Sequence, residues 1–192
     1  MNILIFGKDG GVGSELIKIY SNDNVTSLGK NDINFIANDT KENLSILLTK
    51  LQPDIIINAT GVFGNNDMEY KNIFDVNVKS NWYIIDYYRQ FKSNKTVKII
   101  MIGSTAYNHG RKDYILYAAS KAALHNIYEG ASELFLGSNI FIGLIHPSKI
   151  NTKMIANLSE GQKSKCLSPE FVAKNINIFI NKLKKSSYIV LK

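Results

Sequence analysis

Short apolar runs alternate with segments of helical periodicity along the chain, and this alternation restricts the fold more than any other feature. Strands are predicted where apolar runs lie between turn residues, at 3–6, 25–28, 55–57, 97–102, 140–145 and 188–191. Helices are predicted where apolar residues recur at helical spacing, over 14–20, 43–51, 68–91, 114–136 and 169–183. The repeated strand–helix–strand order predicts an α/β fold, a doubly wound parallel sheet with right-handed crossovers.

The length and composition are those of one globular domain. The chain has 192 residues, of which 45% are hydrophobic and 20% charged, so a single domain over 1–192 can bury a sizeable core. No apolar run approaches the ~18 residues that a membrane span needs, and residues 1–6 predict a strand rather than a signal peptide. Cys166 is the only cysteine, which excludes an internal disulfide and suits a cytoplasmic location.

The net charge of +7 comes from 23 basic and 16 acidic residues scattered along the chain. Nucleic-acid binding needs a basic stripe interleaved with exposed aromatic residues, whereas the aromatic residues here have the spacing of core positions. We therefore expect neither a nucleic-acid nor a membrane partner, although a mildly positive field helps to attract a phosphorylated ligand. The histidines fit no metal-ligand spacing, so no metal site is expected.

A glycine-rich turn separates the first predicted strand from the first predicted helix, which is the context of a dinucleotide site. Glycines let backbone N–H groups approach a pyrophosphate, and the helix N-terminus favours its negative charge. Two spacings coexist, at positions 7, 11, 13 and at positions 7, 10, 13, and the alternative is a tight turn that binds nothing. The candidate contacts of this turn are Gly7, Asp9, Gly10, Gly11, Val12 and Gly13.

Residues after the second predicted strand distinguish NAD from NADP. An acidic side chain there accepts from the ribose 2′-OH of NAD, and a basic one pairs with the 2′-phosphate of NADP. Lys30 comes first and favours NADP, whereas Asp32 lies close enough to keep NAD open as the alternative. Both residues could also be solvated loop charges.

Four polar residues have an order and spacing that are typical of a proton-transfer site. Tyr117 and Lys121 are four residues apart, so a helix brings the phenol and the ammonium to one face. Ser104 follows an apolar run 13 residues before the tyrosine, and Asn77 lies 27 residues before the serine. Together with the glycine turn, this pattern over roughly residues 1–152 resembles the short-chain dehydrogenase/reductase family, whose domain is of Rossmann type.

The resemblance implies roles for these four residues in hydride transfer between a nicotinamide and a carbonyl or alcohol. Ser104 would hold the carbonyl oxygen, and Tyr117 would give or take its proton as general acid or base. A free phenol has a pKa of about 10, so Lys121, together with the positive nicotinamide ring of the oxidised cofactor, is expected to lower the pKa of Tyr117, and Lys121 to hold the nicotinamide ribose. Asn77 lies where the family's helix is kinked, and its backbone would hold a water in a proton relay.

Three further segments match the family's cofactor-binding elements. The segment 58–61 resembles an Asn-Ala-Gly element with one insertion, and a structural role is favoured for it. Asp39 lies near the acid that contacts adenine in the family, or it caps the following helix. In the segment 146–152, Ser148 replaces a glycine whose loop could need a positive φ. The expected contacts are Asp39, Asn58, Ala59, Thr60, Gly61, Pro147, Ile150 (to the carboxamide) and Thr152 (to the phosphates), beside Tyr117 and Lys121.

The two longest predicted helices, 68–91 and 114–136, resemble those that pair family members into a four-helix bundle. A homodimer or tetramer is therefore expected, with the alternative that the aromatic residues of the first helix face the sheet. These residues are Tyr83, Tyr87, Tyr88 and Phe91. Because few residues follow the segment 146–152, residues 153–166 are expected to form a short lid, with an open site as the alternative.

The sequence thus predicts an NADP-dependent oxidoreductase, with NAD possible as the cofactor, that acts on a small carbonyl or alcohol substrate. Two alternatives stay open. The opening segment also resembles dehydrorhamnose-reductase-like members, which favours a nucleotide-sugar reductase or epimerase-like enzyme. The second alternative is a non-catalytic protein that senses NADP and regulates a partner.

Overall fold

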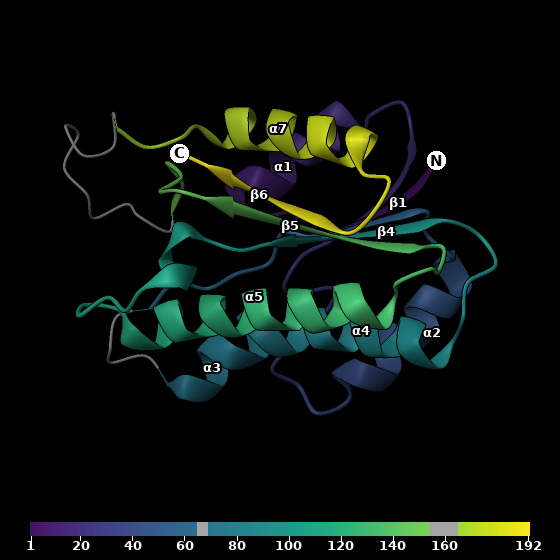
Figure 1. The fold of residues 1–192 in the computed structure, drawn as a ribbon, viewed down its shortest axis with the longest axis horizontal. Coiled ribbons are helices and arrows are strands. Elements are labelled where there is room, and N and C mark those ends of the chain that lie inside the picture. Colours follow the sequence, from purple (N-terminus) through teal and green to yellow (C-terminus); the bar gives the residue numbers. More distant parts are fainter. Residues whose placement is uncertain (65–68, 154–164) are drawn as a thin grey trace.

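The computed structural model describes residues 1–64, 69–153 and 165–192. Its centre is one six-stranded sheet in which every neighbouring pair is parallel, in the order β2-β1-β3-β4-β5-β6 (Figure 1). The strands are β1 (Asn2–Phe6), β2 (Asn24–Leu28), β3 (Ile55–Asn58), β4 (Val97–Ile102), β5 (Ile140–Pro147) and β6 (Ser187–Leu191). Each overlaps a run that the sequence predicted as a strand, so the predicted α/β parallel sheet is confirmed.

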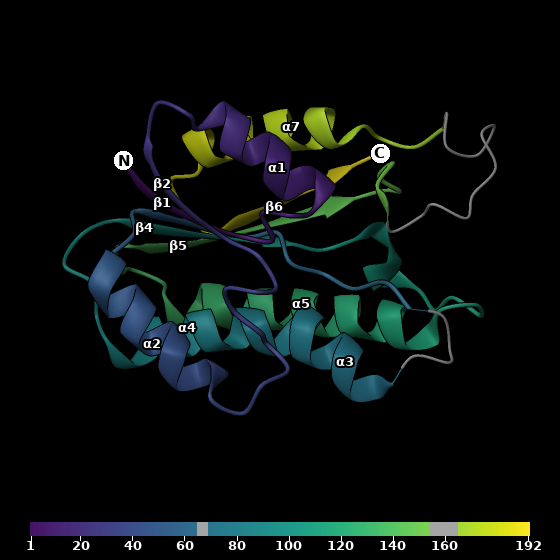
Figure 2. The same ribbon diagram turned by 180° about the vertical axis from the view of Figure 1, so that it is seen from behind.

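Helices cover both faces of the sheet (Figures 1 and 2). One face carries α1 (Gly11–Ile19) and α7 (Pro169–Lys182), and the other carries α2 (Thr40–Leu51), α3 (Tyr70–Phe74), α4 (Ser80–Gln90) and α5 (Ile115–Leu134). Alternate side chains of a strand point to opposite faces. Leu4 and Phe6 of β1 therefore join one buried cluster while Ile3 and Ile5 join the other, and each helical layer has its own core.

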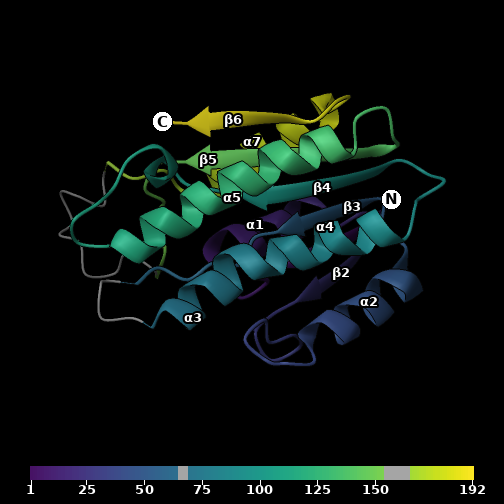
Figure 3. The same cartoon turned by 60° about the horizontal axis from the view of Figure 1, so that its bottom comes forward.

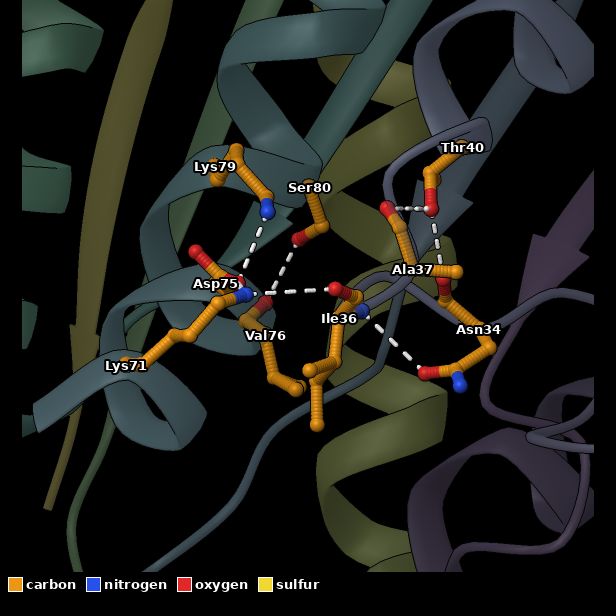
Figure 4. A network of polar contacts seen from close by, with 9 residues as sticks. All are labelled: Asn34, Ile36, Ala37, Thr40, Lys71, Asp75, Val76, Lys79 and Ser80. Atoms are coloured by element: carbon orange, nitrogen blue, oxygen red, sulfur yellow. Dashed lines mark hydrogen bonds and ion pairs between the residues drawn. The ribbon is translucent and has the colours of Figure 1, made fainter. Parts of the chain in front are cut away.

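β2 is one edge of the sheet (Figure 3), and the order differs from the 3-2-1-4-5-6 order of many dinucleotide-binding sheets. The apolar residues after β2 form a loop: Phe35 is 4% exposed and packs edge-to-face on Phe6, with 5.6 Å between ring centroids. The Thr40 hydroxyl donates to the carbonyls of Asn34 and Ala37 and fixes this loop (Figure 4). The winding direction reverses between β1 and β3, and in sheets of this kind ligands bind at such a point, outside the carboxyl ends of the strands.

The last crossover has the opposite hand to the others. α4 and α5 carry the chain from β3 to β4 to β5 along one face, whereas α7 carries it one strand further in the same direction along the other face (Figure 1). The prediction of right-handed crossovers therefore does not hold for the β5–α7–β6 unit. The physical reason is the packing of α7 on α1, which buries Val172, Ile176 and Ile180 in one cluster with Leu16.

The predicted helix over 68–91 contains a wide π-turn, η1 (Asp75–Lys79), between α3 and α4. Side chains stabilise the wider turn. The Ser80 hydroxyl donates to the Val76 carbonyl at 2.6 Å, and the Asn81 amide donates to the Asn77 carbonyl at 3.0 Å. Such turns are common at functional sites, and this one carries the candidate residue Asn77, which is fully buried.

A charged clasp joins the π-turn to the loop after β2. Asp75 pairs with Lys71 at 2.5 Å and Lys79 at 2.8 Å, and Lys71 also donates to the Ile36 carbonyl (Figure 4). Burial raises the pKa of the Asp75 carboxyl, but the two lysines outweigh burial and hold that pKa below its usual value. Asp75 is therefore ionised at neutral pH and fixes both lysines.

The aromatic residues expected to form an oligomer surface divide into two groups. Tyr88 is 5% exposed and lies in the core, and Tyr83 and Tyr87 are partly buried against it. Phe91 at the end of α4 is 53% exposed, and Trp82 is 40% exposed. The exposed apolar surface near α4 is therefore smaller than expected. Among the described residues, no helix combines the length and apolarity that a membrane crossing requires.

Candidate active site

The glycine turn lies at the carboxyl end of β1, beside the end of β3. Gly7 has a φ of +88°, and a Cβ on it would lie 2.8 Å from the main chain of Ala59. A Cβ on Gly13 would lie 2.0 Å from the Gly7 carbonyl oxygen, and one on Gly11 would lie 2.8 Å from Cγ2 of Thr152. Packing therefore requires glycine at positions 7, 11 and 13, which is the first of the two predicted spacings.

The turn leads directly into α1, with Gly10 as the residue before the helix and Gly11, Val12 and Gly13 in its first turn. The N–H groups of a first helical turn have no partner within the helix. That turn contains no acidic residue, so the partial positive charge of the helix end is not neutralised. A turn that only glycine residues can form, together with the partial positive charge of the helix end, fits a pyrophosphate.

Charged residues surround Gly29 at the carboxyl end of β2. The Asp32 carboxylate accepts from the Gly29 N–H at 2.8 Å and pairs with Lys8 Nζ at 2.6 Å, and both contacts hold the pKa of Asp32 below its usual value. The Asp9 carboxylate lies where a Cβ on Gly29 would meet it at 1.9 Å. Lys30, the predicted basic residue, is exposed. Sequence reasoning missed Lys8, although its place inside the glycine turn was the available signal.

Asn58 joins the end of β3 to α4 and is 1% exposed. Its amide donates to Ser80 Oγ at 2.9 Å and to Asn81 Oδ1 at 3.0 Å, while its own Oδ1 accepts from the Thr60 N–H at 3.2 Å. These bonds fit the structural role that was favoured for this segment. They fix the strand end that packs against the glycine turn.

Asn77 holds the loop after β3 to α5. Its Oδ1 accepts from the Val62 N–H at 2.9 Å, and its Nδ2 donates to the Val62 carbonyl and to Ser120 Oγ, both at 3.0 Å. A Cβ on Gly61 would lie 3.6 Å from Asn77 Oδ1 and 3.9 Å from Lys121 Nζ, so these groups are close. The Asn77 carbonyl, which the resemblance assigned to a bound water, accepts from the α4 side chain described above. The sequence identified Asn77 but not these contacts of its side chain.

Ser104 and Tyr117 meet at the carboxyl end of β4. Ser104 precedes the short 3₁₀ turn η2 (Thr105–Asn108), and its hydroxyl accepts from the Ala106 N–H at 3.1 Å. Tyr117 lies in the first turn of α5 (Ile115–Leu134), and its phenol faces the Ser104 side chain. Burial raises the pKa of Tyr117, and the interaction with the Ser104 side chain lowers it only in part.

Lys121 follows Tyr117 by one helical turn and is 4% exposed. Its Nζ donates to the Ile102 carbonyl at 3.0 Å and lies 5.7 Å from the centroid of the Tyr117 ring. Burial lowers the pKa of Lys121 to about 8. The sequence predicted that Lys121, together with an oxidised nicotinamide ring, lowers the pKa of Tyr117. In the protein alone, desolvation of the phenol is the largest effect and raises that pKa.

The loop after β5 (Ile140–Pro147) reaches the same end of the sheet. The Lys149 carbonyl and the Asn151 N–H bond to the main chain of Leu167, so the N–H and C=O of Ile150 itself point away from that partner. Among the described residues, Gln52 alone combines a side chain with a positive φ, so Ser148 replaces the family's glycine without backbone strain. Most of the predicted lid, residues 154–164, lies outside the described residues.

The structure brings most predicted residues to one end of the sheet, at the carboxyl ends of the strands. Asp39 has a different setting: it directly precedes α2, and its carboxylate accepts from the Asn43 amide at 3.0 Å. This contact fits the alternative of a helix-end residue. Sequence reasoning also missed His146, which contacts the main chain of Ser104, because a single histidine in an apolar strand has the pattern of a core residue.

Comparisons with known proteins agree with this geometry. The family model described as short chain dehydrogenase matches residues 49–163. A 3-oxoacyl-(acyl-carrier-protein) reductase from Buchnera aphidicola is 30% identical over 122 residues, which are 60% of this chain and 50% of that protein. An uncharacterized oxidoreductase from Staphylococcus saprophyticus is 27% identical over 151 residues, or 75% of this chain and 62% of that protein. The chain therefore spans less than two thirds of the length of these relatives.

Solved structures share the fold over the length of the chain. A 4-hydroxyisoleucine dehydrogenase complexed with NADH has a TM-score of 0.84 at 20% identity and covers 100% of this chain and 97% of its own. A short chain dehydrogenase from Burkholderia cenocepacia in complex with NADP has a TM-score of 0.83 at 15% identity and covers 100% and 96%. At these identities the likeness shows the fold.

Proposed function

The chain belongs to the short-chain dehydrogenase/reductase family, and from this premise we propose that it is an NADP-dependent oxidoreductase that interconverts a small carbonyl compound and its alcohol. The observation that carries the proposal is that Tyr117 faces the Ser104 side chain, with Lys121 Nζ 5.7 Å from the centroid of the Tyr117 ring. These side chains lie at the carboxyl ends of the strands, where the glycine turn also lies. Two hydroxyl groups there can act on one substrate oxygen.

The proton chemistry follows from the charge that develops on the substrate. NADPH, when bound, supplies a hydride to the carbonyl carbon. Ser104 accepts from the Ala106 N–H, which orients its own hydroxyl proton toward an acceptor such as the substrate oxygen. Tyr117 then gives its proton to that oxygen as general acid. Burial keeps the phenol protonated at neutral pH, which favours the direction of carbonyl reduction.

Lys121 acts as a binding and orienting residue. Its ammonium has three N–H donors, and one is used on the Ile102 carbonyl at 3.0 Å. The others remain for the hydroxyl groups of the cofactor ribose. With a pKa of about 8, Lys121 is charged below that pH and loses its charge above it. Its charge also favours the phenolate that Tyr117 must become after it gives up a proton.

Aromatic rings beside Tyr117 form an apolar wall that fits the body of a small organic substrate. The ring centroid of Phe63 lies 4.9 Å from that of Tyr117 and 5.1 Å from that of Tyr114. Such a wall excludes water from the reacting oxygen and strengthens the hydrogen bonds made to it. The wall therefore supports a carbonyl compound with an apolar part as the substrate class.

Two basic residues at the end of β2 support NADP over NAD. Lys30 is exposed, and Lys8 reaches the same site from the glycine turn. Asp32, which pairs with Lys8 at 2.6 Å, competes with a 2′-phosphate for this lysine. The preference for NADP is therefore expected to be moderate, and it rests on both lysines together.

Homo-oligomerisation through α4 and α5 also belongs to this proposal. Trp82 and Phe91 are 40% and 53% exposed and supply apolar surface at α4, although the inward position of Tyr88 makes that surface smaller than the sequence predicted. Sedimentation of the purified chain tests this part. A monomer at micromolar concentration would contradict it.

Fluorescence titration of the purified chain with NADPH and NADH tests the cofactor, and oxidation of NADPH in the presence of an acetoacetyl thioester and simple ketones tests the reaction. The variant Tyr117→Phe should keep NADPH binding and lose at least about 100-fold in turnover, as expected for loss of a general acid. The variant Tyr70→Phe changes an exposed tyrosine and is the matched control. Absence of binding to either dinucleotide would overturn the proposal.

A further inference from the structure

A line of polar contacts leads from the back of Ser104 to the protein surface. The Ser104 N–H donates to His146 Nδ1 at 3.2 Å, and His146 Nε2 lies 3.0 Å from His125 Nδ1. His125 Nε2 in turn lies 3.6 Å from a carboxylate oxygen of Glu129. His146 on β5 is fully buried, whereas the Glu129 side chain on α5 is 61% exposed. One main-chain group of the active site is thus connected to a surface carboxylate through two imidazoles.

Packing fixes the ring of His146 in this position. A Cβ on Gly103 would lie 2.4 Å from His146 Nδ1, so only glycine lets the ring approach the end of β4. Tyr107 stacks on the other side, with 3.9 Å between ring centroids and 23° between ring planes. The ring therefore has little freedom to rotate or withdraw, and its contact with Ser104 is built into the fold.

The order of donors along this line follows from its inner end. The Ser104 N–H can only donate, so Nδ1 of His146 accepts, and a neutral His146 carries its proton on Nε2. That proton faces His125 Nδ1, which therefore accepts. A neutral His125 then carries its own proton on Nε2, the nitrogen on the side of Glu129. The Ser104 carbonyl, 3.0 Å from His146 Nδ1, already accepts from the Tyr107 N–H at 3.1 Å.

We propose that His146 is a positioning residue for Ser104 and that His125 sets the tautomer in which it does so. Protonation of His125 turns its Nδ1 into a donor, and the proton of His146 must then move from Nε2 to Nδ1. From there it points at the Ser104 carbonyl, and the Ser104 N–H loses its acceptor. The pair therefore holds the Ser104 peptide in one orientation when His125 is neutral and in another when His125 is charged.

The groups around the pair differ on its two sides. Burial is the largest cause that lowers the pKa of His146 to about 4; the backbone contact with Ser104 opposes it, and the charges of His125 and Lys121 act in the same direction as burial. The titratable groups that face the two rings come from η2, α5 and β6. They are Tyr107, Lys121, Tyr128, Glu129 and Tyr188. Of these, Glu129 is the group that carries negative charge at neutral pH, and it lies on the side of His125.

The first test needs neither substrate nor cofactor, so its outcome is separate from that of the proposed oxidoreductase activity. Nitrogen-15 spectra of the imidazoles in the full chain report the tautomer of each of the three histidines, and the variant His109→Gln assigns the exposed one. At neutral pH we expect His146 to be protonated at Nε2 alone. As His125 protonates, the His146 proton should move to Nδ1 and the Ser104 amide resonance should shift with it. A proton on His146 Nδ1 at neutral pH would overturn the proposal. So would a His146 nitrogen-15 signal that does not change when His125 is protonated.

The second test uses variants and rests on the proposed function. His146→Asn keeps an acceptor close to the position of Nδ1, whereas His146→Leu removes it. Loss of one positioning hydrogen bond predicts a fall in kcat of about tenfold for His146→Leu, with unchanged NADPH affinity and with most of the rate recovered in His146→Asn. Equal rates in both variants would contradict the positioning role.

Surface substitution keeps the proposal testable if the buried His146 variants do not fold. Glu129→Gln replaces the carboxylate on the side of His125 Nε2 with an amide that can also donate, so any change in the protonated nitrogen of His125 should bring the matching change in His146. Glu133→Gln, one helical turn further along α5 and also exposed, is the matched control and should leave both tautomers unchanged. A tautomer change at His125 without one at His146 would overturn the coupling.

Discussion

The side chain of Asn77 pairs with the main chain of Val62 as a neighbouring strand would, accepting from its N–H at 2.9 Å and donating to its carbonyl at 3.0 Å. A carboxamide can both accept and donate, whereas a carboxylate can only accept. The pairing fixes the loop after β3 beside Lys121 and the apolar wall. Asn77 therefore supports the site through its structure, whatever part its backbone takes in proton transfer.

Asn77→Asp should destabilise the fold strongly. The substitution removes the donor to Val62 and Ser120 and places a carboxylate at a fully buried position. We expect a loss of about 3 kcal/mol in the free energy of unfolding, measured by urea denaturation. Asn139→Asp, at an exposed position, should change it by less than about 0.5 kcal/mol. A similar urea midpoint for both variants would contradict the role of the pairing between Asn77 and Val62.

Gly13→Ala should also destabilise the protein and prevent dinucleotide binding. Its Cβ would lie 2.0 Å from the Gly7 carbonyl oxygen, so the turn must open. We expect a loss of about 2 kcal/mol or more. Gly130→Ala on α5 is the control: nothing lies within 4 Å of its Cβ, and helix propensity predicts a gain of up to about 1 kcal/mol. Thermal unfolding and NADPH titration of both variants check this pair.

Lys121→Met should stabilise the fold while it abolishes reduction. Burial lowers the pKa of Lys121 from 10.5 to about 8, and a change of that size corresponds to about 3 kcal/mol of destabilisation at pH 7. Loss of the hydrogen bond to the Ile102 carbonyl offsets about 1 kcal/mol of the gain. The free energy of unfolding of the variant should therefore be about 2 kcal/mol higher than that of the wild type at pH 7.

The pH dependence of that difference has a definite sign. Between pH 8 and 10.5 the unfolded chain keeps the Lys121 proton and the folded chain does not. Wild-type stability from this group therefore rises with pH in that window, and the advantage of Lys121→Met shrinks. Lys50→Met, at an exposed position of α2, serves as control and should show no such trend. An advantage that is constant from pH 7 to 10.5 would argue against a depressed pKa.

Asp32→Asn should increase the preference for NADPH over NADH. Asparagine can still accept from the Gly29 N–H, but it releases Lys8 from the 2.6 Å ion pair. We expect NADPH to bind about threefold to tenfold more tightly at low salt, with little change for NADH. Lys8→Ala should have the opposite effect. If neither variant alters the ratio of the two affinities, the 2′-phosphate is recognised elsewhere.

The sequence predicted the sheet well because buried parallel strands are continuous apolar runs between turn residues. Periodicity could not predict the π-turn at Asp75–Lys79, because α and π turns have nearly the same local apolar periodicity, although the family resemblance placed a kink at Asn77. Here the difference depends on two side chains, Ser80 and Asn81, that bond to carbonyls one turn earlier. The hand of the last crossover was equally hidden, because it depends on the packing of α7 against α1.

For the site, spacing identified Ser104, Tyr117 and Lys121 but could not give their electrostatics. Whether Lys121 lowers the pKa of Tyr117 depends on burial and on where the ammonium points, and it bonds to the Ile102 carbonyl. Lys8 was missed because its contact with Asp32 joins two loops that are far apart in the sequence. Such pairings become visible only when the strand ends are placed side by side.

The packing of α7 on α1 has a consequence for synthesis of the protein on the ribosome. Leu16 of α1 shares its buried cluster with Val172, Ile176 and Ile180 of α7. This apolar face emerges early and stays uncovered until residues 169–182 have been translated. During that interval the nascent chain presents a hydrophobic helix face, a feature that promotes aggregation and recruits chaperones. The first helix of the fold thus depends for its burial on a partner that is translated about 150 residues later.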